Sequence, residues 1–291
     1  NEGYEITVYR DDDDDDYDSV GSTTCTFGGG YNPNRCYTTN EPTSVWDIQC
    51  SASTTPSQNC TGNTDQVVTY DCTFPLWFVA DPTDSGTQYP LNDWRANVRA
   101  IDDDNATGTP TESLDDAVQL ESYLAYDLTS TQIPFGQLEP GQSSDDLPSG
   151  NLGLGLSDNQ ASTSMIATGN VGLDQSLEGE AMCPTFNSIY TGPLGPKCPN
   201  SATSTIGAEF QVFTATTTDT YDNASTSGNF ISSTTPANLE INIPKSTATS
   251  SFQIASGTTY YGILVPSGIQ LSDDYTGLNT IIGVTGEAAD W

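Results

Sequence analysis

The residues best suited to chemistry in this sequence are carboxylates, because the chain contains no histidine. This composition excludes Ser-His-Asp and Cys-His catalysis, and it excludes any histidine-ligated zinc or copper site. The most unusual local feature is the run of six aspartates at 11–16, which Asp18 follows closely. Adjacent carboxylates repel one another by about 1 kcal/mol per close pair even in water. The run therefore needs bound cations or wide separation in solvent.

Calcium is the cation that this set of ligands favours, because hard oxygen ligands without His or Cys select it among the common cations. A second acidic turn at 102–104 follows a predicted strand, where it could complete a cage of oxygen ligands. We expect a calcium site built from Asp11, Asp12, Asp13, Asp14, Asp102, Asp103 and Asp104. Neither stretch has the spacing of an EF-hand loop, so a solvated acidic loop is an equal alternative.

The overall charge narrows the classes of partner. The 39 acidic residues against 6 basic ones give a formal net charge of −33, which excludes duplex nucleic acid and anionic membrane surfaces. A surface adapted to concentrated salt is a competing explanation for this charge. Paired carboxylates could hydrolyse glycosides, but so many acidic residues form pairs by chance, and we expect no enzymatic activity. No stretch approaches the roughly 18 apolar residues of a membrane-spanning helix, so no membrane insertion is expected.

The seven cysteines indicate an oxidising compartment. None has CxxC spacing, and five lie in the first quarter of the chain among small polar residues, as in loop-rich secreted proteins. Cys183 and Cys198 flank a Pro/Gly-rich loop and are predicted to pair. Further disulfides are predicted among the earlier cysteines with the pairing left open, and these are Cys25, Cys36, Cys50 and Cys72, with Cys60 beside them. The odd count leaves one cysteine as a buried free thiol or as a bond between subunits.

Three Asn-x-Ser/Thr sequons are candidate glycosylation sites in expected loops: Asn59, Asn105 and Asn223. Together with the cysteines, they predict an extracellular or cell-surface location.

Short alternating runs bounded by turn residues dominate the sequence, and no segment keeps a 3.6-residue apolar period over three turns. The runs are 4–8, 66–70, 76–80, 94–101, 118–128, 151–156, 210–214, 239–243, 260–265 and 280–284. Strands separated by loops without intervening helices predict an all-β fold of two immunoglobulin-like β-sandwich domains in tandem, stapled by disulfides. We place the first domain at 11–107, a linker at 108–117 and a larger sandwich at 118–291, with residues 1–10 as a separate N-terminal strand.

Two stretches carry a resemblance. Leu76–Asp84 and Trp94–Asp103, with the pattern Trp-x-x-x-Val-x-Ala-x-Asp ending in an acidic turn, resemble late strands of PKD-like and immunoglobulin-like modules of prokaryotic surface proteins. Phe135–Gly141, Leu239–Lys245 and Tyr260–Pro266 are similar to domains that accompany such modules in secreted proteins. The resemblance implies a surface location and a structural or adhesive role, and it implies no catalytic residue.

The N-terminal strand carries the functional hypothesis. Tyr4, Ile6 and Val8 form one apolar face, and a charge run that cannot pack follows at once. Such a strand could complete the sheet of another copy, so we predict a subunit of an extracellular filament that assembles head to tail, with calcium bridging the acidic surfaces. An ordinary first strand of its own domain is the competing interpretation. The alternative function is a monomeric adhesin or carbohydrate-binding sandwich, in which an exposed tryptophan among Trp46, Trp77, Trp94 and Trp291 would bind glycans.

Overall fold

The fold is all-β in a computed structural model of the chain. The residues that it describes are 3–11, 32–39, 47–52, 69–101, 104, 106, 108, 111–112, 117–146, 161–184, 190–192, 195–198, 204–216, 220–248, 252–269 and 274–291. Among them, no helix is both long enough and apolar enough to cross a membrane.

The strands are short and follow one another with few helical interruptions. They are β1 Gly3–Arg10, β2 Cys36–Thr38, β3 Gln49–Ala52, β4 Tyr70–Thr73, β5 Trp94–Ile101, β6 Thr111–Glu112, β7 Tyr126–Leu128, β8 Ala161–Ala167, β9 Leu173–Gly179, β10 Cys183–Pro184, β11 Tyr190–Gly192, β12 Gly195–Lys197, β13 Gln211–Thr214, β14 Ala237–Ile243, β15 Thr247–Ala248, β16 Phe252–Gln253, β17 Ser256–Ile263, β18 Tyr275–Thr276 and β19 Asn279–Thr285. Helical elements are α1 Thr220–Thr226 and the 3₁₀ turns Ser144–Asp146, Ala208–Phe210 and Ala288–Asp290.

The chain divides into two compact units that are not contiguous in sequence. Unit 1 comprises Asn1–Tyr123, Gly169–Val171 and Ser246–Ile254. Unit 2 comprises Leu124–Thr168, Gly172–Lys245 and Ala255–Trp291. A late hairpin of the chain, β15–β16, thus belongs to unit 1. The segment predicted as a linker contains β6, which pairs with β5 in the same unit.

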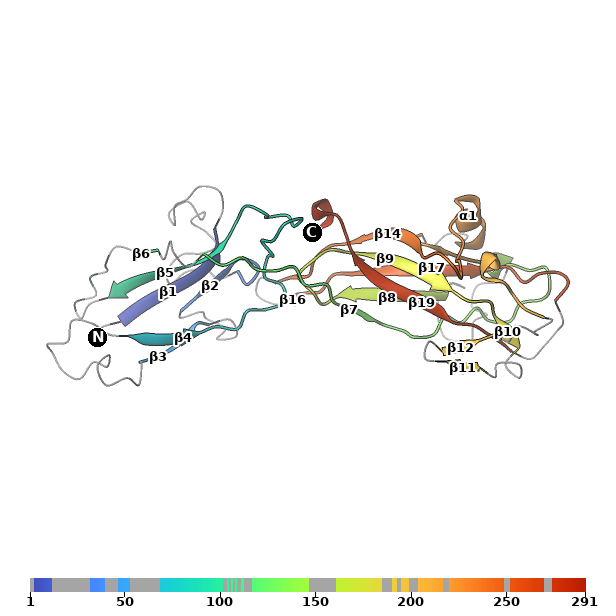
Figure 1. Ribbon diagram of the computed structural model, residues 1–291, viewed down its shortest axis with the longest axis horizontal. Helices are drawn as coiled ribbons and strands as arrows, with labels where there is room; N and C mark the ends of the chain where they lie inside the picture. The colour runs from blue at the N-terminus through green and yellow to red at the C-terminus, as the bar shows by residue number, and fades with distance from the viewer. Residues whose placement is uncertain are drawn as a thin grey trace. The chain divides into compact units, whose positions relative to one another are not determined.

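Unit 1 is built on a four-stranded antiparallel sheet in the order β2-β1-β5-β6. Figure 1 shows β1 between β2 and β5. A second, two-stranded sheet pairs β3 with β4, and the Cys50–Cys72 disulfide joins opposite positions of its register. The core contains Tyr37, Val79 and Trp94, and the late hairpin adds Ala248 and Phe252 to it. Unit 1 therefore buries apolar side chains that lie more than 200 residues apart in the sequence.

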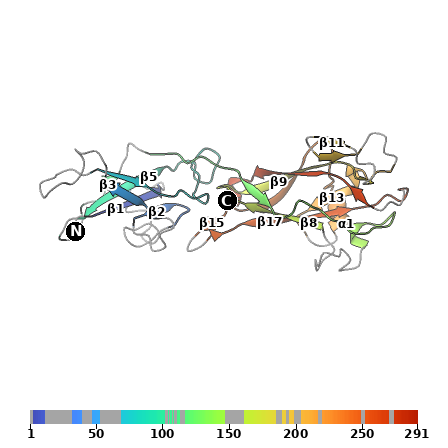
Figure 2. The ribbon, with the colours of Figure 1, turned by 90° about the horizontal axis from the view of Figure 1, so that it is seen from below.

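Unit 2 is a β-sandwich. One sheet has the order β13-β17-β8-β7 and the other has the order β14-β9-β19; Figure 2 shows β13, β17 and β8 from a second side. Their facing side chains form one cluster, to which Phe213 and Tyr261 contribute from the first sheet and Leu177 and Leu239 from the second. Because strands of both sheets supply fully buried residues, each sheet covers the apolar face of the other.

Asp145, which is distant in sequence, caps the N-terminal end of α1, the only α-helix in the described part of the chain. The backbone N–H groups of Tyr221 and Asp222 donate to the two carboxylate oxygens of Asp145, at 3.0 and 2.9 Å. These N–H groups have no partner within the helix, because its first turn leaves its donors free. The sequence expectation of strands alone missed this helix.

The strand expectations met different outcomes. The run 94–101 forms β5 with the expected bounds, and the runs 4–8, 239–243 and 280–284 lie within the longer strands β1, β14 and β19. The run 76–80 is not a strand: it ends in a turn, in which the Ala80 N–H donates to the carbonyl of Trp77 at 2.9 Å, and its Val79 belongs to the core. The runs 66–70 and 151–156 lie wholly or mostly outside the described residues.

Candidate functional site

The candidate site is the slot that β1 occupies in unit 1. Every residue of β1 from Gly3 to Arg10 pairs antiparallel with a residue of β5, in a register that joins Gly3 to Ile101 and Arg10 to Trp94. On its other edge, Thr7–Tyr9 pair with β2. β1 is thus a central strand that uses both of its backbone edges, and its loss would open the edges of two neighbours.

The two faces of β1 differ in burial. Tyr4, Ile6 and Val8, the predicted apolar face, are only partly buried, and Ile6 and Val8 pack at the margin of the core. The opposite face is buried more deeply, because Thr7 and Tyr9 are both 0% exposed. Neither face of the strand is solvated, so the alternation read from the sequence does not mark inside and outside here.

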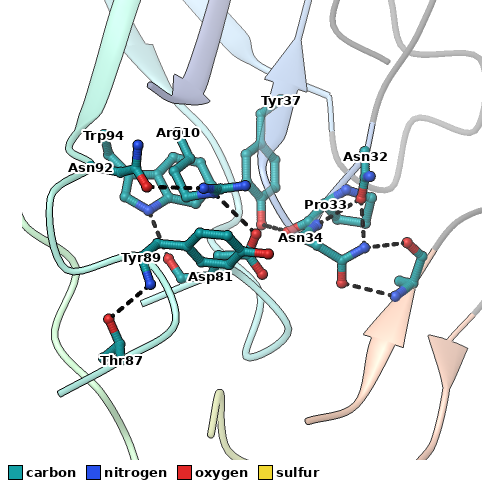
Figure 3. A network of polar contacts seen from close by, with 11 residues as sticks. Arg10, Asn32, Pro33, Asn34, Tyr37, Asp81, Thr87, Tyr89, Asn92 and Trp94 are labelled. Atoms are coloured by element: carbon teal, nitrogen blue, oxygen red, sulfur yellow. Dashed lines mark hydrogen bonds and ion pairs between the residues drawn. The ribbon is translucent and has the colours of Figure 1, made fainter. Parts of the chain in front are cut away.

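At the end of β1, Arg10 lies among four side chains from the loop 77–93 and the start of β5, which we call the Arg10 cage: Asp81 and Trp94 are buried, and Tyr89 and Asn92 are partly buried. Arg10 Nε lies 3.2 Å from Asp81 Oδ2, and both side chains are 7% exposed. Arg10 Nη1 donates to Asn92 Oδ1 at 3.2 Å, and the guanidinium carbon lies 3.4 Å from the centroid of the Tyr89 ring. Figure 3 shows Arg10 enclosed by these groups.

Hydrogen bonds to its backbone N–H and carbonyl groups hold Asp81 in place beside Arg10. The Asp81 N–H donates to the carbonyl of Asn34 at 2.6 Å, and the Trp94 indole N–H donates to the Asp81 carbonyl at 2.9 Å. The Trp94 contact ties the loop to the first residue of β5, which is itself the register partner of Arg10. The carboxylate is therefore preorganised, so that pairing with Arg10 costs little side-chain entropy.

Burial sets the electrostatics of the cage. The pKa of the Tyr89 hydroxyl is raised by desolvation, and Asp81 raises it further, whereas Arg10 and Arg35 oppose the rise. Tyr89 thus stays neutral and presents its ring face to the guanidinium, the geometry of a cation–π contact. In this low-dielectric setting the ion pair stabilises both charges, because removing Arg10 or Asp81 would take a close opposite charge away from the buried partner.

A second polar group supports the slot from β2 and the turn before it. The Tyr37 hydroxyl donates to the carbonyl of Pro33 at 2.9 Å and accepts the Trp77 N–H at 3.1 Å. Desolvation raises the pKa of Tyr37, and the hydrogen bond from Trp77 counteracts this. Asn34 pairs by both ends of its amide with the backbone of Ala248, at 2.7 and 3.1 Å. These contacts, also drawn in Figure 3, anchor the late hairpin in unit 1.

Two more ion pairs border the slot. Glu5 of β1 forms an ion pair with Arg99 of β5, its register partner, and Arg99 Nε donates to Glu5 Oε2 at 2.8 Å. Asp11, just after β1, lies 3.2 Å from Arg95 Nε through its Oδ2. The arrangement is suited to holding a strand in one register; it presents complementary charges rather than a reactive centre.

The predicted calcium ligands are only partly within the described chain. Asp11 is 8% exposed and its carboxylate faces Arg95, so it serves an ion pair. Asp104 is exposed, whereas Asp12, Asp13, Asp14, Asp102 and Asp103 lie outside the described residues. Neither Asp11 nor Asp104 belongs to a cluster of three potential ligands among the residues that the structure describes.

A different acidic cluster lies in unit 2, and we call it the acidic triad (Asp174, Glu240 and Glu287). Carboxylate oxygens of the three side chains lie within 4.8 Å of one another. Asp174 is 4% exposed, and its Oδ1 accepts the N–H groups of Ile241 and Asn242, both at 2.9 Å. Three carboxylates suit a hard cation, although calcium takes 6–8 oxygens in total. Sequence reasoning missed this triad because its members lie on separate segments without a common motif.

The remaining sequence candidates take varied places. Disulfides join Cys50 to Cys72 and Cys183 to Cys198, and Cys36 is also disulfide-bonded, which is consistent with a non-cytoplasmic protein. Asn223 is exposed on α1, whereas Cys25, Cys60, Asn59 and Asn105 lie outside the described residues.

The tryptophans take different places in the described part of the chain. Trp94 is 6% exposed and Trp77 packs against the core of unit 1. The Trp291 indole N–H donates to the carbonyl of Gly286 at 3.1 Å. Trp46 lies outside the described residues.

Comparisons with known proteins give no relative. No protein family, no curated protein and no solved structure matches the chain. The class of protein is thus defined by its own fold. The chain is all-β, contains disulfides and has two units, and ion pairs hold the central strand of the four-stranded sheet in unit 1.

Proposed function

We propose that the chain is a structural subunit of an extracellular assembly in which β1 of one copy occupies the slot of another. The observation that carries this proposal is the combination of a central β1 with a long connection to its neighbour β2. Residues 11–35 separate the two strands in sequence. Residues 12–31 alone, if extended, reach on the order of 60 Å. The connection is thus long enough for β1 to leave its own slot and enter another.

Exchange would conserve every favourable contact of the slot. A second copy supplies the same backbone edge to β5 and β2, the same Tyr9 and the same Arg10 for the cage. The balance between the intramolecular and exchanged forms then depends on loop entropy and protein concentration, since the contacts are identical. If each copy donates to the next, the contact is heterologous and generates an open filament; reciprocal donation would close a dimer.

The charge of the chain gives calcium a role in this proposal. Copies that each carry a formal charge of −33 repel one another at close range. A divalent cation on the acidic triad, or on the aspartate run at 11–16, would reduce this repulsion. Calcium would thus favour assembly, and its removal would oppose it.

The extracellular part of the proposal is supported by the disulfides. Cys50–Cys72 and Cys183–Cys198 close loops in separate units, and such bonds persist in oxidising compartments. The exposed sequon at Asn223 is compatible with the same location. Surface modules of the PKD-like and immunoglobulin-like kind, which the sequence resembles, would fit this role.

A covalent trap tests the exchange directly. Val8 and Ala96 are register partners across β1 and β5, so a V8C/A96C chain should form a disulfide between them. Under the proposal, assembled protein resolved by non-reducing SDS electrophoresis gives a ladder of covalent multimers, and negative-stain electron microscopy shows filaments that chelator disperses. The V8C single variant controls for scrambling with native cysteines. Covalent monomers from a concentrated sample, with dispersed particles, would refute exchange.

A second candidate function, glycan binding by a surface protein, is favoured by exposed aromatic rings in unit 1. Tyr70 on β4 and Phe74 just after it are 42% and 36% exposed, and aromatic faces can stack on sugar rings. A glycan array with the full chain tests this function. Ligand signal that Tyr70→Ala abolishes, while Leu91→Ala at an 84% exposed position retains it, would favour an adhesin.

A further inference from the structure

The slot is lined with an ordered set of charges, in a chain that has very few basic residues. Only six lysines and arginines occur in 291 residues. Three of the four arginines form ion pairs that each involve β1 or the residue after it: Arg99 with Glu5, Arg10 with Asp81, and Arg95 with Asp11. The scarce positive charge of the chain is thus concentrated around one strand.

These pairs define a pattern along the strand. β1 presents an acidic residue at 5 and a basic one at 10, and the acidic residue at 11 follows the strand directly. The slot presents Arg99, Asp81 and Arg95 to these three residues. A shift of two residues would keep the same faces of β1, but it would place Glu5 opposite Asn97 or Ile101 instead of Arg99. The same shift would remove Arg10 from its cage. The charges therefore specify one register where backbone hydrogen bonds alone would accept several.

The pattern also distinguishes β1 from the other strands of the protein. Among the described strands, β1 alone carries both an acidic and a basic residue. β9 carries Asp174 and Glu178 without a basic residue, and β5 carries two arginines without an acidic one. A strand such as β9 would bring no cation to Asp81 in the place of Arg10, so this buried carboxylate would lose the ion pair with β1.

We infer that the slot is selective for β1 of this same protein, and that the pairs Glu5–Arg99, Arg10–Asp81 and Asp11–Arg95 are the determinants of that selectivity. The inference rests on the proposed exchange of β1, and it names the partner of the slot: a second copy, read by charge. A foreign strand with a suitable apolar face but without this order of charges would be rejected. Like charges placed opposite each other across an interface oppose binding, which is the physical basis of the discrimination.

Charge reversal at Glu5 and Arg99 tests this inference in the full chain. This pair is the most exposed of the three, with side chains 24% exposed for Arg99 and 15% for Glu5, so reversal there is the least disruptive to folding. Glu5→Arg places two arginines opposite each other within one chain, and Arg99→Glu places two glutamates there. In a mixture, β1 of the Glu5→Arg variant matches the slot of the Arg99→Glu variant. The unchanged β1 of the Arg99→Glu variant likewise matches the unchanged slot of the Glu5→Arg variant, so each variant can be rescued only by the other.

The expected result is complementation in trans. Each single variant assembles on the order of a hundredfold more slowly than wild type by light scattering. An equimolar mixture recovers wild-type assembly, and the E5R/R99E double variant recovers it alone. Circular dichroism of each variant verifies the fold, and Glu139→Arg, an exposed change in unit 2 with the same charge difference as Glu5→Arg, controls for net charge.

The outcomes separate the two proposals. If the wild type assembles through β1 in the covalent trap but the mixture assembles no faster than the single variants, selectivity by charge is overturned and the exchange of β1 stands. Single variants that assemble at the wild-type rate would also overturn selectivity by charge and leave the exchange of β1 standing. If the wild type gives no covalent ladder at all, the exchange fails, and the inference that rests on it fails with it.

Discussion

Unit 1 and unit 2 are both antiparallel β structures, but different interactions hold their buried polar groups. Unit 1 contains all four arginines of the chain, and ion pairs surround its central strand β1. In the sandwich of unit 2, the interior polar contacts include pairs of neutral groups, such as Thr163 with Tyr261 and Thr259 with Gln175. The comparison shows that a strand held by buried ion pairs is specific but depends on each partner, whereas a contact between two neutral groups costs less stability when one partner is removed.

The largest expected effect is at the Arg10 cage. Asp81→Ala leaves the guanidinium of Arg10 buried without its counter-ion, so we expect unit 1 to lose about 3–5 kcal/mol of stability. Hydrogen exchange measured by mass spectrometry should show faster exchange in 94–101 and unchanged exchange in 173–179. Asp127→Ala, at an exposed position of β7, is the control. Equal acceleration in both units would contradict the assignment of this pair to unit 1.

The corresponding change in unit 2 removes apolar packing. Leu177 is 0% exposed between the two sheets, and Leu177→Ala should cost about 2–5 kcal/mol through lost burial and a residual cavity. The same exchange experiment should now show acceleration in 173–179, with 94–101 unchanged. Leu91→Ala, at an 84% exposed position, should have no measurable effect. A response in unit 1 alone would be incompatible with the sandwich core described above.

High pH should act on the buried tyrosine of the sandwich. Burial raises the pKa of Tyr261 to about 12, and the hydrogen bond with Thr163 opposes the rise. The hydroxyl ionises near pH 10 in the unfolded chain, so its stabilising contribution is complete below about pH 10 and is lost as the pH rises toward 12. Denaturant unfolding across this range should therefore show falling stability of unit 2, by roughly 2–3 kcal/mol from this group.

Tyr261→Phe should reduce this pH dependence, whereas Tyr123→Phe, at a 62% exposed position, should leave it unchanged. An unchanged slope in the Tyr261→Phe variant would show that other groups control alkaline unfolding.

The smallest effect is expected from a single neutral hydrogen bond. The Thr259 hydroxyl donates to Gln175 Oε1, and both residues are 0% exposed. Thr259→Val leaves that oxygen buried without the bond, at a cost of about 1–3 kcal/mol in thermal unfolding. Thr258→Val, whose hydroxyl contacts Ser164 at a partly buried position, should cost less. A larger loss of stability from Thr258→Val than from Thr259→Val would contradict the expectation that the more deeply buried hydrogen bond contributes more.

Much of the strand content was predictable where residues alternate strongly. β5 was predicted with its observed bounds, because Trp94 and Val98 lie on one face of the run and Arg95, Asn97 and Arg99 lie on the other. β8 and β9 were missed for different reasons. The buried positions of β8, Ala161, Thr163, Met165 and Ala167, are mostly small, and the apolar Ile166 lies on the less buried face, so the alternation is weak in the sequence. β9 is buried on both faces and carries Asp174 and Gln175 inside, so it has no alternation to detect.

The candidate site was predictable only in outline. The sequence indicated a strand over 4–8 with Tyr4, Ile6 and Val8 as its apolar face, but it did not indicate that Thr7 and Tyr9 are buried more deeply. The reason is that burial on a central strand depends on which elements cover each face. Sequence spacing could not predict the ion pair between Arg10 and Asp81 either, because Asp81 lies in a turn-rich loop about 70 residues further along the chain.

Composition and local spacing by themselves determined several properties of this protein: the lack of imidazole chemistry, the strongly negative charge, the all-β class and the pairing of Cys183 with Cys198 across a short loop. These follow from residue types and local spacing, which act without long-range contacts. Only the tertiary structure decided that β15–β16 belongs to unit 1, that Arg10 meets Asp81, and that Asp174, Glu240 and Glu287 converge. Such contacts join residues far apart in sequence, and chain folding selects them through the packing of whole elements rather than through any local pattern.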